Sequence, residues 1–322
     1  MPDPGSDRSG VGPSVADVGE RELLRQIARI VDAAPQATET IVGIGDDAAV
    51  IRGAASMVVT TDALVDGAHF RLDWCSPVQV GRRAVIANAA DVAAMGGRTT
   101  ACVAAIAAPP STPARTVLGI VEGLAQQCAD IGAAVAGGDL VAAAQIVVTV
   151  TAVGQLDGDA VLLSGARDGQ RLAVSGPIGA AAAGLAVLSA GVDGFDDLTD
   201  RYRVPPTDLA AGVRAGEAGA AAMTDVSDGL AGDALALATA SGVRLRIDPE
   251  RIPVHPSIFR AAEVLGRDPL GWVLGATDDH VLLAAFPGPV PSGWTVIGDV
   301  AAGDPRVDVV GVPDPPDGWH SF

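Results

Sequence analysis

The sequence contains no lysine. All 21 basic residues are arginine, against 39 Asp and Glu, so the formal net charge is −18. A P-loop and the protein-kinase strand motif both require a lysine on the phosphates, and Schiff-base catalysis requires an amine, so these chemistries are excluded. The excess of acid also argues against a nucleic-acid partner, whose phosphates would repel it. If the protein handles phosphates, another group must supply the positive charge.

Aromatic residues and cysteines are also scarce. Aromatics make up 3% of the chain against 49% hydrophobic residues, so we expect a core of Ala, Val, Leu and Ile. The three cysteines (Cys75, Cys102 and Cys128) lie in apolar or helical contexts and are predicted to be buried thiols of a reducing compartment. No Cys-x-x-Cys motif and no Ser/His/Asp order indicates nucleophilic catalysis.

Neither a signal peptide nor a membrane span is expected. The N-terminal residues Met1–Asp17 are polar and rich in Pro and Gly. The stretch Leu172–Val192 has no charge, but Gly176-Pro177 breaks it into a short strand and an Ala-rich helix. The sequence therefore predicts a soluble, cytoplasmic protein, and its length suggests about two domains.

Apolar periodicity predicts interleaved helices and strands. We expect helices at 18–34, 77–95, 113–131, 178–190, 208–222 and 229–241, and strands at 41–51, 56–64, 99–108, 145–153, 171–175, 243–247, 281–286 and 294–300.

Acidic residues gather at the ends of these elements. They are Asp46-Asp47, Asp62, Asp91, Asp139, Asp225 and Asp228. An isolated Asp there is usually a helix cap or a turn residue. Asp91 is different, because it lies on a helix of Ala and Val where an unpaired carboxylate is costly to bury. Clustered carboxylates beside Gly-rich backbone fit Mg²⁺, which prefers hard oxygen ligands and bridges to phosphates. Spacing alone leaves open whether the clusters converge.

Several motifs resemble one family. They are GIGDDAAV, TTDALVDGAHF, NAADVAAMG, AGGD, SGARDGQRLAVSGPIGAAAAGL and DVSDGL, with GWHSF at the end. In this order they resemble the thiamine-monophosphate kinases, of the superfamily that includes aminoimidazole ribonucleotide synthetase. The resemblance covers about residues 18–322.

The resemblance implies a mixed α/β, two-domain aminoimidazole ribonucleotide synthetase-like fold. After a disordered tail (1–17), an N-terminal ATP- and Mg²⁺-binding domain (18–158) would contribute its strands to a barrel in a homodimer. A C-terminal α/β domain (159–322) would follow. The implied activity is ATP-dependent phosphorylation of thiamine monophosphate to thiamine diphosphate with several Mg²⁺ ions, by direct in-line transfer without a catalytic base or nucleophile from the protein.

The resemblance also implies roles for individual residues. The metal ligands would be Asp47, Thr60, Thr61, Asp62, Asp91, Asp139, Asp225 and Asp228, with Asp46 a weaker candidate. ATP would be contacted by Gly138, Asp139, Arg167 and Ser227, and thiamine phosphate by His69, Asp278 and Trp319.

The sequence departs from the family pattern at two places. Where members show Gly-Gly-Glu-Asp-Tyr-Glu-Leu, this chain has Ala276-Thr277-Asp278-Asp279-His280-Val281-Leu282, so Asp278 replaces a Glu and His280 a Tyr. Leu163 stands where members often carry an ATP-binding Arg, and Arg167 is the candidate substitute.

Two alternatives stay open from the sequence. One is another ATP-dependent member of the superfamily, of the aminoimidazole ribonucleotide synthetase type. Selenophosphate synthetase is disfavoured because it would need a reactive Cys and a Lys near the N-terminus. The other is a catalytically silent nucleotide-binding scaffold, supported only by the two departures. The intact acidic set argues against it, since metal ligands repel one another when no cation is bound.

Overall fold

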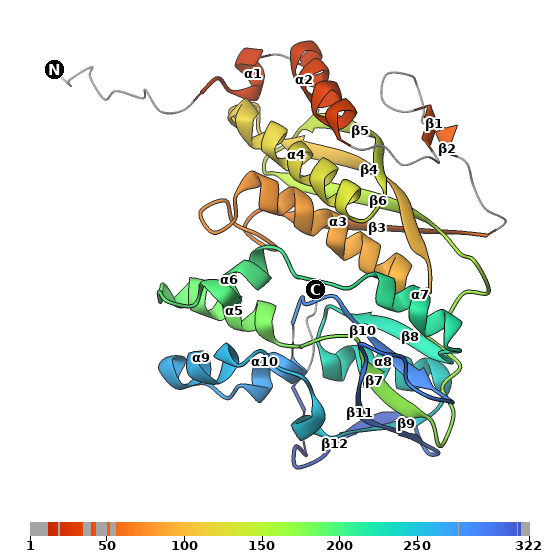
Figure 1. Cartoon of the computed structure of the whole chain (residues 1–322). Coiled ribbons are helices and arrows are strands. Elements are labelled where there is room, and N and C mark those ends of the chain that lie inside the picture. The colour runs from red at the N-terminus through yellow and green to blue at the C-terminus, as the bar shows by residue number, and fades with distance from the viewer. Residues whose placement is uncertain are drawn as a thin grey trace. The chain divides into compact units, whose positions relative to one another are not determined.

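The structure is a computed structural model that describes residues 12–18, 20–34, 40–42, 50–51, 56–275, 277–313 and 315–316. The chain forms two compact units (Figure 1). The first contains Met1–Arg52, Thr61–Val85 and Ala101–Thr151, and the second Gly53–Thr60, Ile86–Thr100 and Ala152–Phe322. The division therefore passes through four elements: Met57–Val65 (β3), Pro77–Ala94 (α3), Arg98–Ala108 (β4) and Val147–Gln155 (β6). The domain bounds expected from the sequence stay a prediction.

A four-stranded sheet of order β3-β6-β4-β5 dominates the first unit, where β5 spans Ala134–Ala142. Parallel strands require a crossover connection, and helix α4 (Ala114–Asp130) supplies it between the parallel strands β4 and β5. The sequence did not predict β5, because Gly137-Gly138-Asp139 has the composition of a turn. Gly138 is needed because a Cβ there would lie 2.3 Å from the carbonyl oxygen of Ala104 on β4.

One face of this sheet is covered and the other is open. Along β4, Cys102, Ala104 and Ile106 are buried, whereas the alternate residues Val103 and Ala105 are exposed. This alternation places every second side chain on the uncovered face. Helices α1 (Val15–Val18) and α2 (Glu20–Ala33) also pack in this unit, α2 against α4. The short strands β1 (Thr40–Val42) and β2 (Val50–Ile51) pair antiparallel.

The second unit is built on a six-stranded sheet of order β12-β9-β11-β7-β10-β8. Its neighbours are antiparallel except β9 and β12, which are parallel. The strands are β7 (Arg171–Val174), β8 (Ala222–Val226), β9 (Arg244–Ile247), β10 (Val281–Phe286), β11 (Thr295–Ala301) and β12 (Arg306–Val309). β12 was not expected, because it lies in a tail rich in Pro and Asp.

Both faces of β10 are buried, because this strand contributes to two separate hydrophobic clusters. Val281, Leu283 and Ala285 face a cluster that includes α8 (Leu230–Ser241) and α10 (Leu270–Leu274). The alternate residues of β10 face a cluster that includes α7 (Ala210–Glu217). A third cluster joins α5 (Ala180–Ala190), α6 (Asp196–Arg203) and α9 (Ser257–Leu265). Helices α6 and α10 were not expected, and for α9 the sequence indicates only a helix start at His255-Pro256.

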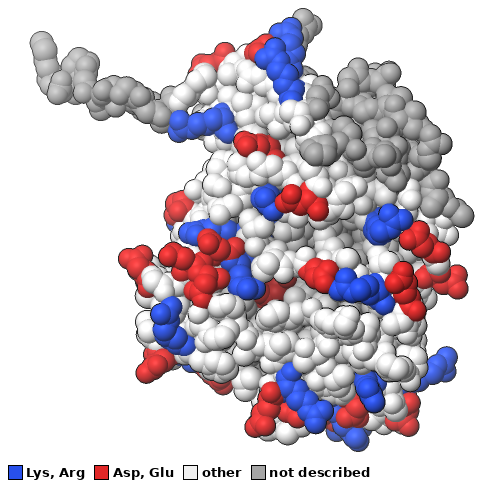
Figure 2. Space-filling model, in the orientation of Figure 1, with Lys and Arg blue, Asp and Glu red and all other residues white. Residues whose placement is uncertain are grey.

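The uncharged stretch 172–192 folds as predicted, with β7 followed by a turn and α5. Among the helices that the structure describes, none combines the length and apolarity that crossing a bilayer requires. On the face in Figure 2, acidic and basic side chains lie near one another. Some of the described charged residues form ion pairs, such as Arg214–Asp208 at 2.5 Å. Such exposed pairs contribute little to stability.

Candidate functional site

In the first unit, Asp62 lies on β3 with an exposed side chain, and His69 follows in the turn after this strand. The Nδ1 atom of His69 accepts a hydrogen bond of 3.1 Å from the backbone N–H of Val65. Burial, together with the charge of Arg83, lowers the pKa of His69, although Asp62 opposes this shift. A neutral imidazole that accepts at Nδ1 carries its proton at Nε2, which is then a donor suited to a phosphate oxygen.

Thr61 and Asp139 also lie in this unit. The hydroxyl of Thr61 donates a hydrogen bond of 3.0 Å to the carbonyl of Val150, so it is engaged within the sheet. Asp139 on β5 is exposed, and its Oδ1 accepts the N–H of Leu140 at 2.9 Å. Its second carboxylate oxygen has no hydrogen bond in the described chain, and it is available to a cation or to water.

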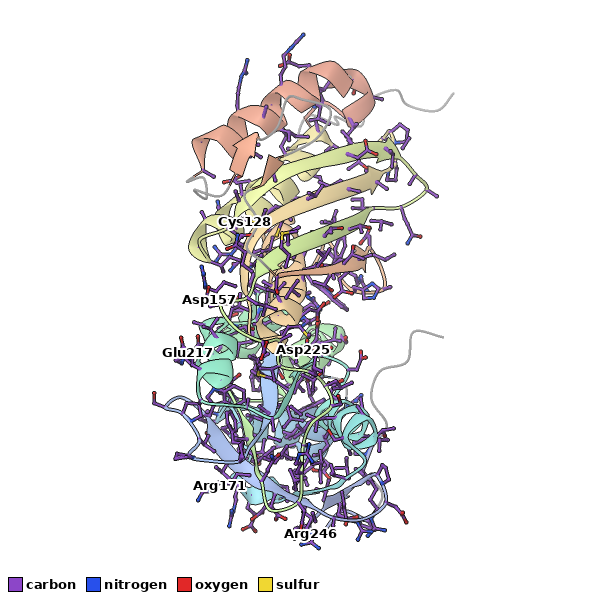
Figure 3. All side chains as sticks on the ribbon, turned by 90° about the vertical axis from the view of Figure 1, so that its right-hand side faces the viewer. Cys128, Asp157, Arg171, Glu217, Asp225 and Arg246 are labelled. Carbon is purple, nitrogen blue, oxygen red and sulfur yellow. The ribbon has the colours of Figure 1, made fainter. Side chains whose placement is uncertain are left out.

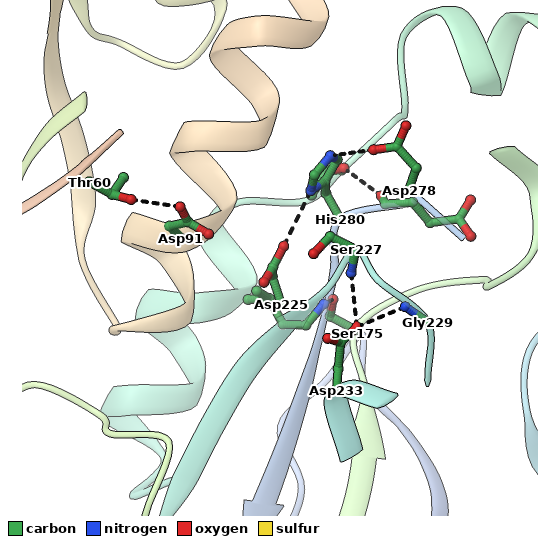
Figure 4. A network of polar contacts seen from close by, with 12 residues as sticks. Thr60, Asp91, Ser175, Asp225, Ser227, Gly229, Asp233, Asp278 and His280 are labelled. Atoms are coloured by element: carbon green, nitrogen blue, oxygen red, sulfur yellow. Dashed lines mark hydrogen bonds and ion pairs between the residues drawn. The ribbon is translucent and has the colours of Figure 1, made fainter. Parts of the chain in front are cut away.

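In the second unit, the first pair of predicted metal ligands is in contact. The Thr60 hydroxyl donates a hydrogen bond of 2.7 Å to Oδ2 of Asp91 on α3 (Figure 4). Asn88, one turn earlier on this helix, is 1% exposed. The sequence indicates that a carboxylate on this apolar helix needs a partner, and the structure gives it the Thr60 hydroxyl. The role of Asp91 as a metal ligand stays a prediction.

Asp225 lies on β8, and the loop between β8 and α8 carries Ser227 and Asp228 (Asp225 is also labelled in Figure 3). Asp233, in the first turn of α8, folds back under it. Its Oδ2 accepts the backbone N–H groups of Ser227 and Gly229, both at 3.1 Å (Figure 4). Sequence reasoning did not select Asp233, because an acidic residue in the first turn of a helix is common.

The carboxylates of Asp225, Asp228 and Asp233 repel one another. Burial, followed by the charges of Asp225 and Asp228, raises the pKa of Asp233 to about 7. A cation would relieve this repulsion. Within the described ranges, however, no three His, Cys, Asp or Glu side chains are placed to hold a metal ion by themselves. This donor set fits Mg²⁺ bound through one or two carboxylates, with phosphate and water oxygens completing the octahedron.

The segment 277–280 lies beside this loop. The backbone N–H of Asp278 donates to the carbonyl of Ser227 at 2.9 Å, and the N–H of His280 to the carbonyl of Val226 at 3.0 Å. Asp278 and His280 have positive φ angles of 56° and 53°. The left-handed conformation is unfavourable for residues with a side chain, so the surrounding contacts must enforce it.

Two predicted residues, Asp47 and Trp319, and the weaker candidate Asp46, lie outside the described residues. Of the two residues considered for an ATP contact, Arg167 is exposed, and Leu163 is 38% exposed. The three cysteines are buried, as expected, and none of them forms a disulfide in the described part of the chain. A hydrogen bond with Cys102, with burial, raises the pKa of Cys128 (labelled in Figure 3) well above its ordinary value, so this thiol is not an activated nucleophile.

Comparison with known proteins gives the family. Residues 45–156 match the model for the N-terminal domain of AIR synthase related proteins, and residues 167–283 match the model for their C-terminal domain. The chain is 45% identical over 314 residues to the thiamine-monophosphate kinase of Mycobacterium tuberculosis, covering 96% of this chain and 93% of that one. It is 42% identical to the Corynebacterium glutamicum enzyme, covering 97% and 96%.

Solved structures of thiamine-monophosphate kinases have a similar fold. The thiamine-monophosphate kinase of Stenotrophomonas maltophilia superposes with a TM-score of 0.78 at 29% identity, covering 89% of this chain and 95% of that one. A structure described as AaThiL complexed with AMPPCP and TMP gives a TM-score of 0.77 at 28% identity, covering 95% and 97%. The two-domain mixed α/β fold is thus confirmed, and the chain belongs to the thiamine-monophosphate kinase family.

Proposed function

We infer that this protein is a kinase that transfers the γ-phosphoryl group of ATP to thiamine monophosphate, giving thiamine diphosphate and ADP. The observation that carries this inference is the 45% identity to a thiamine-monophosphate kinase along 96% of the chain. The relative described with AMPPCP and TMP supports ATP and thiamine monophosphate as the two substrates.

We propose that Mg²⁺ ions accompany the nucleotide and supply the positive charge that lysine provides in other kinases. Asp47, Thr60, Thr61, Asp62, Asp91, Asp139, Asp225 and Asp228 would be the ligands. The repulsion around Asp233 and the Thr60–Asp91 hydrogen bond support this proposal. Bound Mg²⁺ would neutralise charge on the transferring phosphoryl group.

The chain's own residues would mainly bind and orient the substrates. The acceptor is a phosphate that is already anionic at neutral pH, so no strong general base is required. The N–H at Nε2 of His69 would donate to the phosphate of thiamine monophosphate, with Asp278 and Trp319 as further contacts. Gly138, Asp139, Ser227 and Arg167 would contact ATP. Transfer would then be in line, with catalysis by positioning and electrostatics.

We further propose that the protein is a homodimer joined through the uncovered face of the β3-β6-β4-β5 sheet. Val103 and Val141 on this face are 36% and 48% exposed, and Ala105 and Ala107 lie on the same face of β4. A row of small apolar side chains on an open sheet face is suited to a second sheet. The buried cysteines, which form no disulfide among the described residues, support the cytoplasm as the compartment.

The activity test is direct. The purified protein is incubated with ATP, Mg²⁺ and thiamine monophosphate, and thiamine diphosphate and ADP are separated by chromatography. We expect stoichiometric formation of both products, abolished by a chelator of divalent cations. Hydrolysis of ATP without thiamine diphosphate, or binding of nucleotide without turnover, would overturn the proposed function in favour of another member of the superfamily or a silent scaffold.

A further inference from the structure

The imidazole of His280 lies between two carboxylates that belong to different parts of the proposed site. Its Nδ1 lies 3.2 Å from Oδ2 of Asp225, and its Nε2 lies 2.9 Å from Oδ1 of Asp278 (Figure 4). The second contact is a close approach of nitrogen and oxygen that does not have the geometry of a hydrogen bond. Asp225 is a proposed metal ligand and Asp278 a proposed contact of thiamine phosphate.

His280 has little freedom to leave this position. Its side chain is 6% exposed, and its backbone N–H is bound to the carbonyl of Val226. The next residue, Val281, begins β10, where it pairs with Val226 of β8. The residue before it, Asp279, is anchored through its carboxylate to the start of α5. The left-handed backbone at 278 and 280 is therefore fixed from both sides, and with it the direction of the ring.

A buried histidine needs only one partner for each of its polar atoms, and water or a backbone carbonyl is the usual partner. Here both nitrogens face side-chain carboxylates, one on β8 and one in the segment before β10. Asp225 is 14% exposed and Asp278 is 37% exposed, so the carboxylates reach toward solvent while the ring that separates them does not. The ring fixes the spacing of two groups that ligands can reach.

We propose that His280 is a positioning residue that couples the two halves of the substrate site, so that binding of the metal–nucleotide at Asp225 strengthens binding of thiamine phosphate at Asp278. This proposal rests on the proposed function. A cation on Asp225 fixes this carboxylate, which fixes the ring, which in turn holds Asp278 for the second substrate. Coupling of this kind is reciprocal, so thiamine phosphate must strengthen binding of the metal–nucleotide by the same factor.

Three substitutions separate the two contacts. In His280→Asn the amide nitrogen takes the place of Nδ1 and keeps the contact with Asp225, and Asn tolerates a positive φ better than most residues. In His280→Gln the amide nitrogen takes the place of Nε2 and keeps the contact with Asp278. His280→Phe keeps an aromatic ring and loses both contacts. His255→Gln is the matched control, because His255 also faces an aspartate, Asp197 at 3.6 Å, at the start of α9.

The measurement is calorimetric binding of thiamine monophosphate to the full-length protein, with and without Mg²⁺ and a non-hydrolysable ATP analogue. We expect the analogue to increase affinity at least about fivefold in the wild type and in His255→Gln, and less than about twofold in His280→Phe. His280→Asn should retain metal-dependent binding of the analogue while losing affinity for thiamine phosphate, and His280→Gln should do the reverse. In steady-state kinetics of the His280 variants, KM for the substrates should change more than kcat.

The outcomes are distinguishable. Thermal unfolding without ligands shows whether each variant is folded, and if His280→Phe is not, His280→Asn carries the test. A folded His280 variant that keeps the full coupling, while the wild type makes thiamine diphosphate, overturns the role of His280 alone. A wild type that neither binds thiamine monophosphate nor makes product overturns this proposal together with the proposed function.

Discussion

The carboxylate of Asp279 accepts a hydrogen bond of 2.9 Å from the backbone N–H of Ala181 in the first turn of α5. Its other oxygen accepts the N–H of Gly179 at 2.5 Å, and the Thr207 hydroxyl donates to its backbone carbonyl at 3.1 Å. A residue in the segment before β10 thus caps a helix that begins about 100 residues earlier. This cap ties the segment that carries His280 to the core of the second unit.

The first prediction concerns stability and pH. Burial raises the pKa of Asp279 from 3.8 to about 6, although the two N–H donors act against this shift. Because the folded pKa exceeds the unfolded one, the contribution of this group to stability is complete below pH 3.8 and is lost as the pH rises through 6. The loss is about 3 kcal/mol, from the difference between a pKa of 3.8 and one of about 6. Asp279→Asn should be less stable than the wild type at pH 4, and the gap should narrow toward pH 7.

Urea unfolding of both proteins at pH 4, 5, 6 and 7 measures this gap in the free energy of unfolding. An Asn in this place presents one amide N–H toward a backbone N–H, which explains the deficit at low pH. A gap that stays constant, or that widens with pH, would show that Asp279 is not the group responsible.

The second prediction concerns the Gly137-Gly138 pair. A Cβ at Gly138 would lie 2.3 Å from the carbonyl oxygen of Ala104, whereas a Cβ at Gly137 meets nothing within 4 Å. Gly138→Ala should therefore force β5 away from β4 and cost about 1–3 kcal/mol in the free energy of unfolding. Gly137→Ala is the matched control and should unfold like the wild type. Equal stability of the two variants would contradict the close approach of these strands.

The third prediction concerns Asp233. One oxygen, Oδ2, accepts the N–H groups of both Ser227 and Gly229, so the amide oxygen of an Asn can replace it. Asp233→Asn should keep KM for ATP within about threefold of the wild type. Asp233→Ala leaves two N–H groups without their acceptor and should raise this KM about tenfold or more. If steady-state kinetics give the two variants the same KM for ATP, Asp233 does not hold the loop between β8 and α8 in place through these hydrogen bonds.

The fourth prediction tests the proposed dimer interface. Val103→Asp places a charge on the open face of the sheet and should give a monomer in sedimentation velocity at a concentration where the wild type is a dimer. Phe259→Asp is the control, because Phe259 is 57% exposed on α9 and lies outside this face. Dissociation by the control, or a dimer in Val103→Asp, would contradict the proposed interface.

Local sequence signals were sufficient for much of the fold. The six apolar residues Val281–Phe286 predict a buried strand, and β10 is buried on both faces. The break at Gly176-Pro177 separates β7 from α5 as expected. The missed strand β5 shows where such signals fail, because Gly137-Gly138-Asp139 favours a turn by propensity. There the close approach of β4, which only a glycine allows, overrides that preference.

The candidate site also contains some residues that the sequence could predict and others that it could not. Asp91 could be selected because a carboxylate on a helix of Ala and Val needs a partner, and Thr60 is that partner. Asp233 could not be selected from the sequence, because its hydrogen bonds from two backbone N–H groups form only when the loop folds back onto α8. The placement of His280 depends on Asp225, 55 residues away along the chain, and on pairing of β8 with β10, which no local pattern reports.

The fifth prediction concerns the Thr60–Asp91 pair. The Thr60 hydroxyl donates a hydrogen bond of 2.7 Å to Oδ2 of Asp91, which is a ligand of the proposed metal site. Thr60→Val has the same shape without the hydroxyl, so it removes this hydrogen bond to the carboxylate, and it should raise the Mg²⁺ concentration for half-maximal activity about tenfold. Thr60→Ser keeps the donor and should stay within about threefold, whereas Asp91→Asn should lower kcat by orders of magnitude. Mg²⁺ titrations of the initial rate at saturating ATP compare the four proteins, and a Thr60→Val titration that overlies the wild type would show that this hydroxyl does not orient a metal ligand.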